Sequence, residues 1–168
     1  GKTDGWDWFG HGGGFQGYLS RTVSIPACEL SISILSNSID GGAPFWMDGA
    51  LQILRAVRTR GAPTRRTRDW TGRWWTIWGA SDLVPMGDRV LVANPQFYNP
   101  FMDAGEIEVT GRDTGRIVSA SGYASHGEPV RRVRDKRGKV TGVWLGGAHV
   151  RPAGVVAKEI RRKYTRGK

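Results

Sequence analysis

Short β-rich runs follow one another from Trp70 onward, and this spacing constrains the fold more than any other feature of the sequence. Runs such as WTGRWWTIW, DRVLVANP and GEIEVTGRD recur at intervals of roughly ten residues, with Gly, Pro, Asn and Asp between them. Short antiparallel strands need their edges covered, and closing the sheet into a barrel removes the edges altogether. We therefore predict a small all-β barrel domain over residues 70–168.

Residues 1–60 have a different pattern, which begins with strands. The runs YLSRTVSI at 18–25 and ELSISILSNS at 29–38 are typical of β-strands, because apolar residues alternate with serines in the second run. The link PAC between them is short enough for an antiparallel hairpin. A third strand is predicted from Trp6 to Gly10, ending at His11.

An amphipathic helix is predicted after these strands. Pro44 suits a first helical turn, and Gly61 with Pro63 ends the pattern. Three- and four-residue spacing predicts one buried face, formed by Trp46, Ala50, Ile53, Leu54 and Val57. Three strands and one helix leave an apolar helix stripe and an open sheet edge, so this segment is interpreted as the end of a larger unit. Residues 61–69, GAPTRRTRD, are interpreted as a basic linker.

The positive charge of the chain is unevenly distributed. The formal net charge is +10, and residues 1–60 contribute none of it because five basic residues balance five acidic ones. Such asymmetry permits binding to anionic partners without requiring it. The basic residues gather in predicted turns and no recognised nucleic-acid motif is present, so we predict no nucleic-acid partner. No apolar run reaches the roughly 18 residues of a membrane-spanning helix, so no membrane span is predicted.

The residues that could bind metals are few and scattered. Cys28 is the single cysteine, which leaves no partner for an internal disulfide or a thiolate metal site. His126 and His149 lie far apart in the sequence without ligand spacing around either. We therefore predict no metal site and no cofactor, and we expect a cytoplasmic location.

The stretch WDWFGHGGGF contains the strongest candidate site. His11 directly precedes Gly12, Gly13 and Gly14, with aromatic residues on both sides. Consecutive glycines remove side chains where another group must approach the backbone closely. The same pattern also fits a structural histidine followed by a glycine bend, and the residues alone leave both interpretations open.

Together with the strands, the SNS loop and the helix that follow it, this motif resembles part of a known family. The segment is similar to the C-terminal part of the serine β-lactamase and penicillin-binding protein superfamily, in its D-aminopeptidase and esterase-like branch with an H-x-G third motif. The resemblance implies an α+β chain that begins with a β-lactamase-like antiparallel sheet and packing helix. It also implies catalytic roles for His11 and Gly14, whose backbone N–H would complete an oxyanion hole, and substrate contacts for Gly12, Gly13 and Phe15.

The nucleophile that this resemblance requires is not in the sequence. None of the serines has a lysine three residues later, so no S-x-x-K motif is present, and the YNP at Tyr98 is interpreted as a loop of the barrel. We therefore expect the nucleophile on a complementary N-terminal chain that carries the S-x-x-K and Y-x-N type motifs, and the opening on Gly1 fits a chain that has been processed or truncated. Natural processing and an isolated expression fragment both remain open.

The second segment resembles the small lipocalin-like barrel that some relatives of this family carry after the hydrolase domain. Gly72 and Trp74 match the G-x-W of a lipocalin entry strand. Several tryptophans either line a ligand cavity or fill the barrel core, namely Trp70, Trp74, Trp75, Trp78 and Trp144.

Two functions follow from these resemblances. The first is a serine hydrolase or acyl transferase that acts through an acyl-enzyme on amide or ester bonds of a small-molecule or peptide substrate, such as small esters or peptides with D-residues. The alternative is a non-catalytic β-barrel module that binds an apolar ligand.

Overall fold

A computed structural model describes residues 1–3, 5–120 and 126–164, and the chain forms two compact units. The first unit comprises Gly1–Ala56 with Phe97–Asn99, and the second comprises Val57–Gln96 with Pro100–Lys168. Residues 121–125 and 165–168 of the predicted barrel lie outside the described residues.

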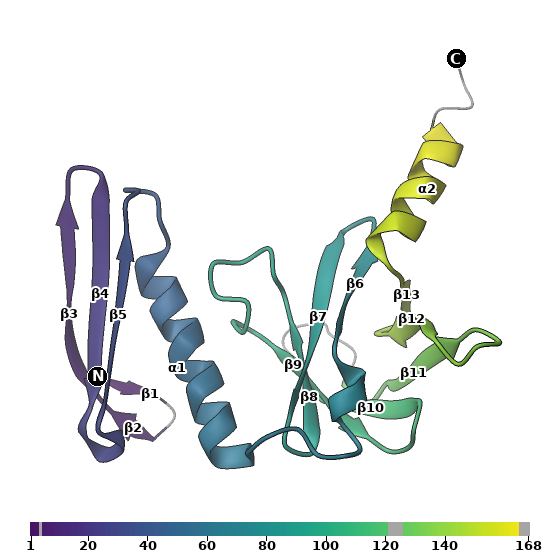
Figure 1. Ribbon diagram of the computed structural model, residues 1–168, viewed down its shortest axis with the longest axis horizontal. Coiled ribbons are helices and arrows are strands. Elements are labelled where there is room, and N and C mark those ends of the chain that lie inside the picture. The colour runs from purple at the N-terminus through teal and green to yellow at the C-terminus, as the bar shows by residue number, and fades with distance from the viewer. Residues whose placement is uncertain (4, 121–125, 165–168) are drawn as a thin grey trace. The chain divides into compact units, whose positions relative to one another are not determined.

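The first unit contains a small antiparallel sheet in the order β3-β4-β5, a short β1-β2 pair and the helix α1 (Figure 1). The Pro26–Cys28 link forms a single 3-10 turn between β4 and β5, in agreement with the predicted hairpin. The bounds are β1 (Lys2–Thr3), β2 (Trp6–Asp7), β3 (Phe9–Phe15), β4 (Tyr18–Ile25), β5 (Leu30–Ser36) and α1 (Ala43–Arg60).

One face of this sheet is apolar and packs against α1. Val23 and Ile25 of β4 form a buried cluster with Met47 and Leu51 of α1. The predicted buried face of the helix is therefore wrong in most positions: Trp46, Leu54 and Val57 are exposed. Met47 and Leu51 are also four residues apart, so they satisfy the same helical spacing, and the sheet rather than the local pattern selects them.

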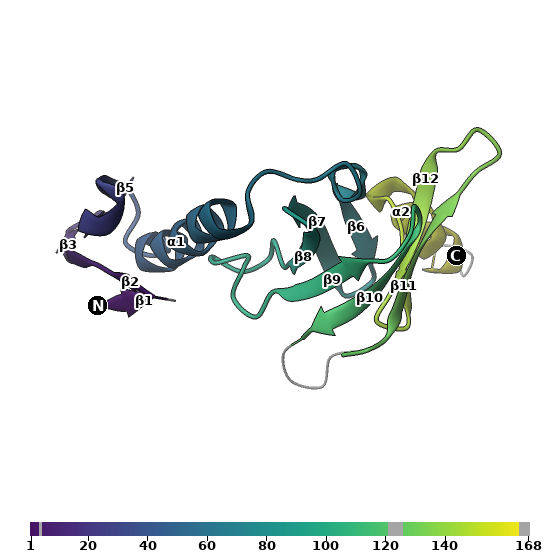
Figure 2. The same ribbon diagram turned by 90° about the horizontal axis from the view of Figure 1, so that it is seen from below.

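The second unit contains a near-closed antiparallel barrel, which confirms the predicted α+β class and the predicted barrel (Figures 1 and 2). The prediction that residues 70–168 are all-β is wrong at their end, where the helix α2 follows the last strand. Each strand pairs with its neighbours in chain order, and Trp75 and Arg151 close the seam through N···O hydrogen bonds of 2.7 and 2.9 Å. The elements are β6 (Gly72–Thr76), β7 (Gly79–Met86), β8 (Arg89–Ala93), β9 (Gly105–Val109), β10 (Thr114–Ser119), β11 (Pro129–Arg134), β12 (Val140–Leu145), β13 (Ala148–Val150), α2 (Ala153–Tyr164) and a 3-10 turn, η2 (Arg68–Trp70).

Trp70 and Arg132 pack together inside the barrel. Trp70 is 1% exposed and belongs to the main hydrophobic cluster together with Trp74. The Arg132 guanidinium lies 4.5 Å from the centre of the Trp70 ring, and its Nε lies 3.0 Å from Oδ1 of Asp113. Of the five tryptophans singled out above, Trp70 and Trp74 therefore fill the core, whereas Trp78 is 88% exposed.

The Asp113 carboxylate stabilises this cluster in a pH-dependent way. Its hydrogen bonds from Arg134, followed by the charge of Arg132, hold the pKa of the carboxyl below its usual range. A lowered pKa in the folded state means that the stabilisation is complete above the ordinary carboxyl value and is lost as the pH falls through the folded value.

We expect Asp113→Asn to lower the free energy of unfolding of the second unit by about 3 kcal/mol near neutral pH, because the buried Arg132 guanidinium then loses its carboxylate counter-charge and keeps its hydrogen bonds to the Asp69 and Arg112 carbonyls. The difference from wild type should shrink as the pH falls through the lowered pKa of Asp113, because the wild-type protein then loses the same charge. Urea titrations at several pH values measure this. Asp82→Asn is the matched control, since Asp82 pairs with the more exposed Arg73 and its loss should cost much less stability than the loss of Asp113. If both variants lose the same free energy of unfolding, the buried pair of Asp113 and Arg132 does not have the stabilising role assigned to it.

Neither of the helices in the described part of the chain is long and apolar enough to cross a membrane.

Candidate functional site

The glycine run lies within a strand rather than in a bend. β3 continues from Phe9 through the glycines to Phe15, so the predicted strand end at His11 is wrong. The chain reverses at Gln16 and Gly17, where Gly17 has a φ of +81°, which glycine adopts without the strain that a Cβ brings. All five predicted site residues, from His11 to Phe15, therefore share one extended strand.

β3 is an edge strand, since it pairs with β4 on one side and with no other strand in the described part of the chain. In a hairpin with a two-residue turn, the residues that flank the turn, here Phe15 and Tyr18, form a hydrogen-bonded pair. The pairs alternate from there, so Gly14 and Gly12 occupy non-hydrogen-bonded positions opposite Leu19 and Arg21. Their backbone N–H and C=O groups consequently point to the open edge of the sheet.

Packing within the chain does not explain glycine at positions 12 and 14. A Cβ added at either position would have its nearest neighbour at 3.6 Å, an ordinary contact. Neither residue has a positive φ, so the backbone conformation does not require glycine either. Gly13 differs, because a Cβ there would lie 2.6 Å from the Ser20 hydroxyl. Glycine weakens a strand, and where packing does not require it, it often marks a place where a ligand or another backbone approaches closely.

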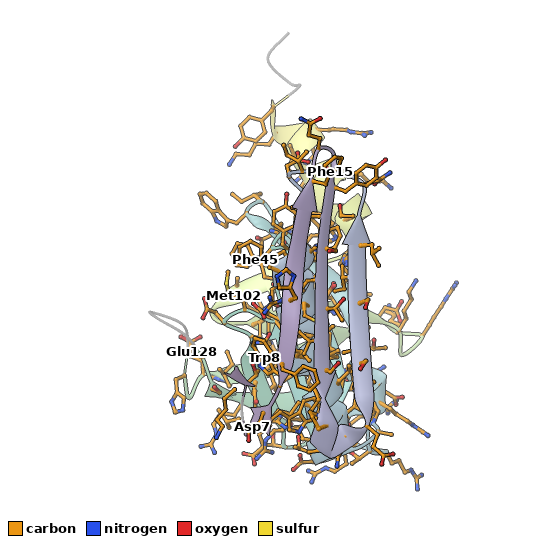
Figure 3. All side chains as sticks on the ribbon, turned by 90° about the vertical axis from the view of Figure 1, so that its left-hand side faces the viewer. Asp7, Trp8, Phe15, Phe45, Met102 and Glu128 are labelled. Carbon is orange, nitrogen blue, oxygen red and sulfur yellow. The ribbon has the colours of Figure 1, made fainter. Side chains whose placement is uncertain are left out.

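The predicted site residues are divided between the two faces of the sheet. Gly13, Gly14 and Phe15 line a hollow of about 450 Å³ at the hairpin end of β3, together with Tyr18 and Leu35. Figure 3 shows Phe15 at this end of the strand and Trp8 near the other end. Gly12 is not among the lining residues of this hollow.

His11 lies outside that hollow, although it shares with Phe15 and Tyr18 the face of the sheet opposite α1. Gly12 and Gly14 lie on the other face, where Val23 packs against α1. The register places His11 beside Thr22, whose hydroxyl lies 2.9 Å from that of Ser33. The His11 side chain is exposed and has no hydrogen bond to the described residues. The structure thus brings His11 next to a row of hydroxyls and leaves its imidazole accessible.

Arg21 is a further residue of this site, which the sequence motif alone does not reveal. Arg21 is the cross-strand partner of Gly12, and its guanidinium lies 5.2 Å from the centre of the Trp8 ring. A fixed cation beside an open strand edge can attract the carboxylate or the carbonyl oxygen of a bound molecule. The two-residue Gln16-Gly17 turn was the signal that could have found it, because turn length sets the register of a hairpin.

The other polar candidates have structural surroundings. Ring stacking joins His149 to Trp144 at 4.8 Å, and burial, followed by the nearby Arg151, lowers the pKa of this histidine. Cys28 is a half-buried free thiol. Within residues 1–3, 5–120 and 126–164, no group of His, Cys, Asp or Glu side chains could hold a metal ion.

Comparison with known proteins gives weak likenesses only. No family model matches the sequence, and no curated protein matches it either. The crystal structure of SurE with D-Leu is 17% identical at a TM-score of 0.39, covering 86% of this chain and 35% of that one. The octameric penicillin-binding protein homologue from Pyrococcus abyssi is 19% identical at a TM-score of 0.37, covering 88% of this chain and 34% of that one. The chain thus spans about a third of the length of these structures.

These findings overturn the assignment to the serine β-lactamase and penicillin-binding protein superfamily. The assignment rested on a short motif and the order of the elements around it, while no family model or curated relative supports it. Structural likenesses with TM-scores of 0.37 to 0.39 do not restore it. The β-lactamase-like description of the first unit is not confirmed either, and the role of the site rests on its own geometry.

Proposed function

We propose that this chain provides the acyl-binding strand of a serine hydrolase or acyl transferase that acts on amide or ester bonds. One observation carries the proposal: Gly12 and Gly14 direct backbone groups to an open sheet edge, and no contact with the residues that the structure describes requires glycine at either position. An edge of this kind suits a substrate carbonyl, which must come within hydrogen-bond distance of a backbone N–H.

In the proposed reaction, the Gly14 N–H donates a hydrogen bond to the substrate carbonyl oxygen as negative charge develops there. A serine oxygen bonds to the carbonyl carbon, and the amine or alcohol leaves with a proton, giving an acyl-enzyme. Water or an amine then attacks the same carbon and releases the serine. His11 of β3 and Arg21 of β4, on opposite faces of the sheet, orient the polar groups of the substrate.

The proposal needs a second polypeptide segment, because no serine of this chain belongs to the motif that the chemistry requires. That segment would supply the nucleophile and a lysine or tyrosine that accepts its proton. Small esters and peptides with D-residues are the first substrates to test. The proposed location is the cytoplasm, where the single free thiol of Cys28 stays reduced.

Intact mass spectrometry of the natively purified protein, before and after treatment with a fluorophosphonate probe, tests this function. We expect a second polypeptide segment to copurify and to gain the mass of the probe, while residues 1–168 gain none. Labelling of a hydroxyl on the exposed sheet face, such as Thr22 or Ser33, would instead place the nucleophile in this chain and contradict the proposal. Absence of any labelled polypeptide would also contradict it.

The barrel supports a second candidate function, binding of a small apolar ligand. A cavity of about 230 Å³ opens among Ser81, Val92, Ile117 and Leu145. This volume lies below the roughly 300 to 1,000 Å³ of ordinary small-molecule sites, so the candidate ranks second. Saturable binding of an apolar ligand without any covalent labelling would favour it over the hydrolase.

A further inference from the structure

The C-terminal helix of the second unit has almost no packing partner. Figure 1 shows α2 projecting away from the barrel strands, and Val156 is the one buried residue of its described length, Ala153–Tyr164. A helix of 12 residues is marginal in water unless tertiary packing supports it. The exposed position of α2 therefore points to a further surface that covers it.

α2 combines an apolar stripe with basic flanks. Ala153, Val156, Ala157, Ile160 and Tyr164 recur at helical spacing and form the stripe. At 100° per residue, Arg161 and Lys163 fall on its two sides, and Lys158 and Arg162 fall on the opposite face. The one acidic residue of the helix, Glu159, forms an ion pair of 2.6 Å with Arg151. The helix thus carries four basic side chains and one carboxylate, which forms an ion pair with Arg151.

The hairpin between β6 and β7 extends the apolar surface beside this helix. Its two-residue turn consists of Ile77 and Trp78, which are 70% and 88% exposed. Hairpin turns of this length favour Asn and Gly, so two large apolar residues there need another reason. A groove of about 300 Å³ is lined by Ile77 and Trp75 on the hairpin and by Val156 and Ile160 on α2.

We propose that the Ile77-Trp78 tip and α2 together form a docking surface for an anionic lipid bilayer. Tryptophan prefers the boundary between headgroups and acyl chains, and an amphipathic helix with basic flanks lies in that same boundary. The positive charge of α2 complements anionic headgroups, and the protruding tip can enter the acyl region. A folded acidic protein would meet a convex tip, and nucleic-acid stacking would leave Ile77 without a role, so a bilayer fits the observations best.

Flotation with lipid vesicles tests the proposal on the protein in its native assembly. We expect binding to vesicles of phosphatidylcholine with about a third phosphatidylglycerol, little binding to pure phosphatidylcholine, and weakening by added salt. Ile77→Ser with Trp78→Ser should reduce the partition coefficient about tenfold or more, and Arg162→Glu with Lys163→Glu should do the same. Failure of the wild-type protein to bind anionic vesicles at low salt overturns the proposal.

A matched charge reversal distinguishes this surface from general attraction by net charge. Lys136→Glu with Arg137→Glu changes the charge equally at the exposed turn between β11 and β12 and should leave most of the binding intact. An equal loss in this control overturns the proposal.

An environment-sensitive fluorophore keeps the test independent of folding defects in the serine variants. Attached to Ile77→Cys in a Cys28→Ser background, it should shift to the blue on anionic vesicles, whereas the same fluorophore on Lys136→Cys should not. If the protein floats with the vesicles but the emission of the fluorophore at position 77 does not shift to the blue, the proposal is also overturned. Labelling by fluorophosphonate is unaffected by either result, so the two proposals fail separately.

Discussion

Replacing Gly14 with alanine is expected to slow acylation of the assembled enzyme about a hundredfold while making the first unit slightly more stable. The added methyl group would stand beside the N–H that we propose to bind the substrate carbonyl, and a displacement of about 1 Å at a reacting centre can cost a factor of that size. Inside the chain the new Cβ would meet Leu19 Cδ2 at 3.6 Å, an ordinary contact. Removing a glycine from a strand should add roughly 0.5 to 1 kcal/mol to the free energy of unfolding.

The opposite signs of these two effects make the experiment informative. Acylation is measured by the rate of fluorophosphonate labelling and by the initial burst of product released from an acetate ester. Calorimetry of the same samples measures the stability of the fold. A substitution that damaged the fold would lower both quantities. If Gly14→Ala keeps the wild-type labelling rate, the β3 edge does not bind the acyl group and the proposed function is wrong.

Gly13→Ala is the matched control on the same strand. Gly13 forms a hydrogen-bonded pair with Ser20, so its N–H points towards β4 and away from the open edge. Its new Cβ would approach the Ser20 hydroxyl at 2.6 Å, and that side chain can rotate away. We expect a much smaller change in the labelling rate and no gain in stability. If Gly13→Ala lowers the labelling rate as much as Gly14→Ala does, the effect does not depend on which way the backbone N–H points, and the assignment of Gly14 is wrong.

A comparison of β5 with β3 shows how far the sequence alone can predict this fold. Alternation of Leu30, Ile32 and Ile34 predicted β5 correctly, because a strand with one buried face leaves a period of two in its side chains. The sequence of β3 shows no alternation with a period of two, since most of its inner residues are glycines without side chains. Its extent was therefore missed, although its existence was predicted.

The candidate site needed the register, which no single strand contains. Once β3 and β4 are paired through a two-residue turn, Gly12 and Gly14 point outwards and Arg21 comes opposite Gly12. The motif could identify the residues, but not the direction of their N–H groups. The predicted buried face of α1 was wrong for a related reason. Two sets of residues on the helix satisfy the helical period, and only packing against the sheet determines that Met47 and Leu51 are the buried ones.

Trp70→Ala is expected to destabilise the second unit by about 3 to 5 kcal/mol, a large part of the stability of a domain of this size. Trp70 is among the largest fully buried side chains, and its ring supports the Arg132 guanidinium at 4.5 Å. Its removal leaves a cavity and also deprives a buried cation of one of its contacts. Guanidinium chloride unfolding, followed by far-ultraviolet circular dichroism, measures the loss.

Trp78→Ala removes a side chain of the same size from the exposed hairpin tip of the same unit. The Trp78 ring is 88% exposed, so this substitution should change the free energy of unfolding by less than about 0.5 kcal/mol. Equal losses in the two variants would mean that the tip packs against the barrel and that Trp70 is not its structural centre. If Trp78 contributes nothing to folding, its exposed ring is available for the bilayer contact that we propose, and vesicle binding by Trp78→Ala measures that contact directly.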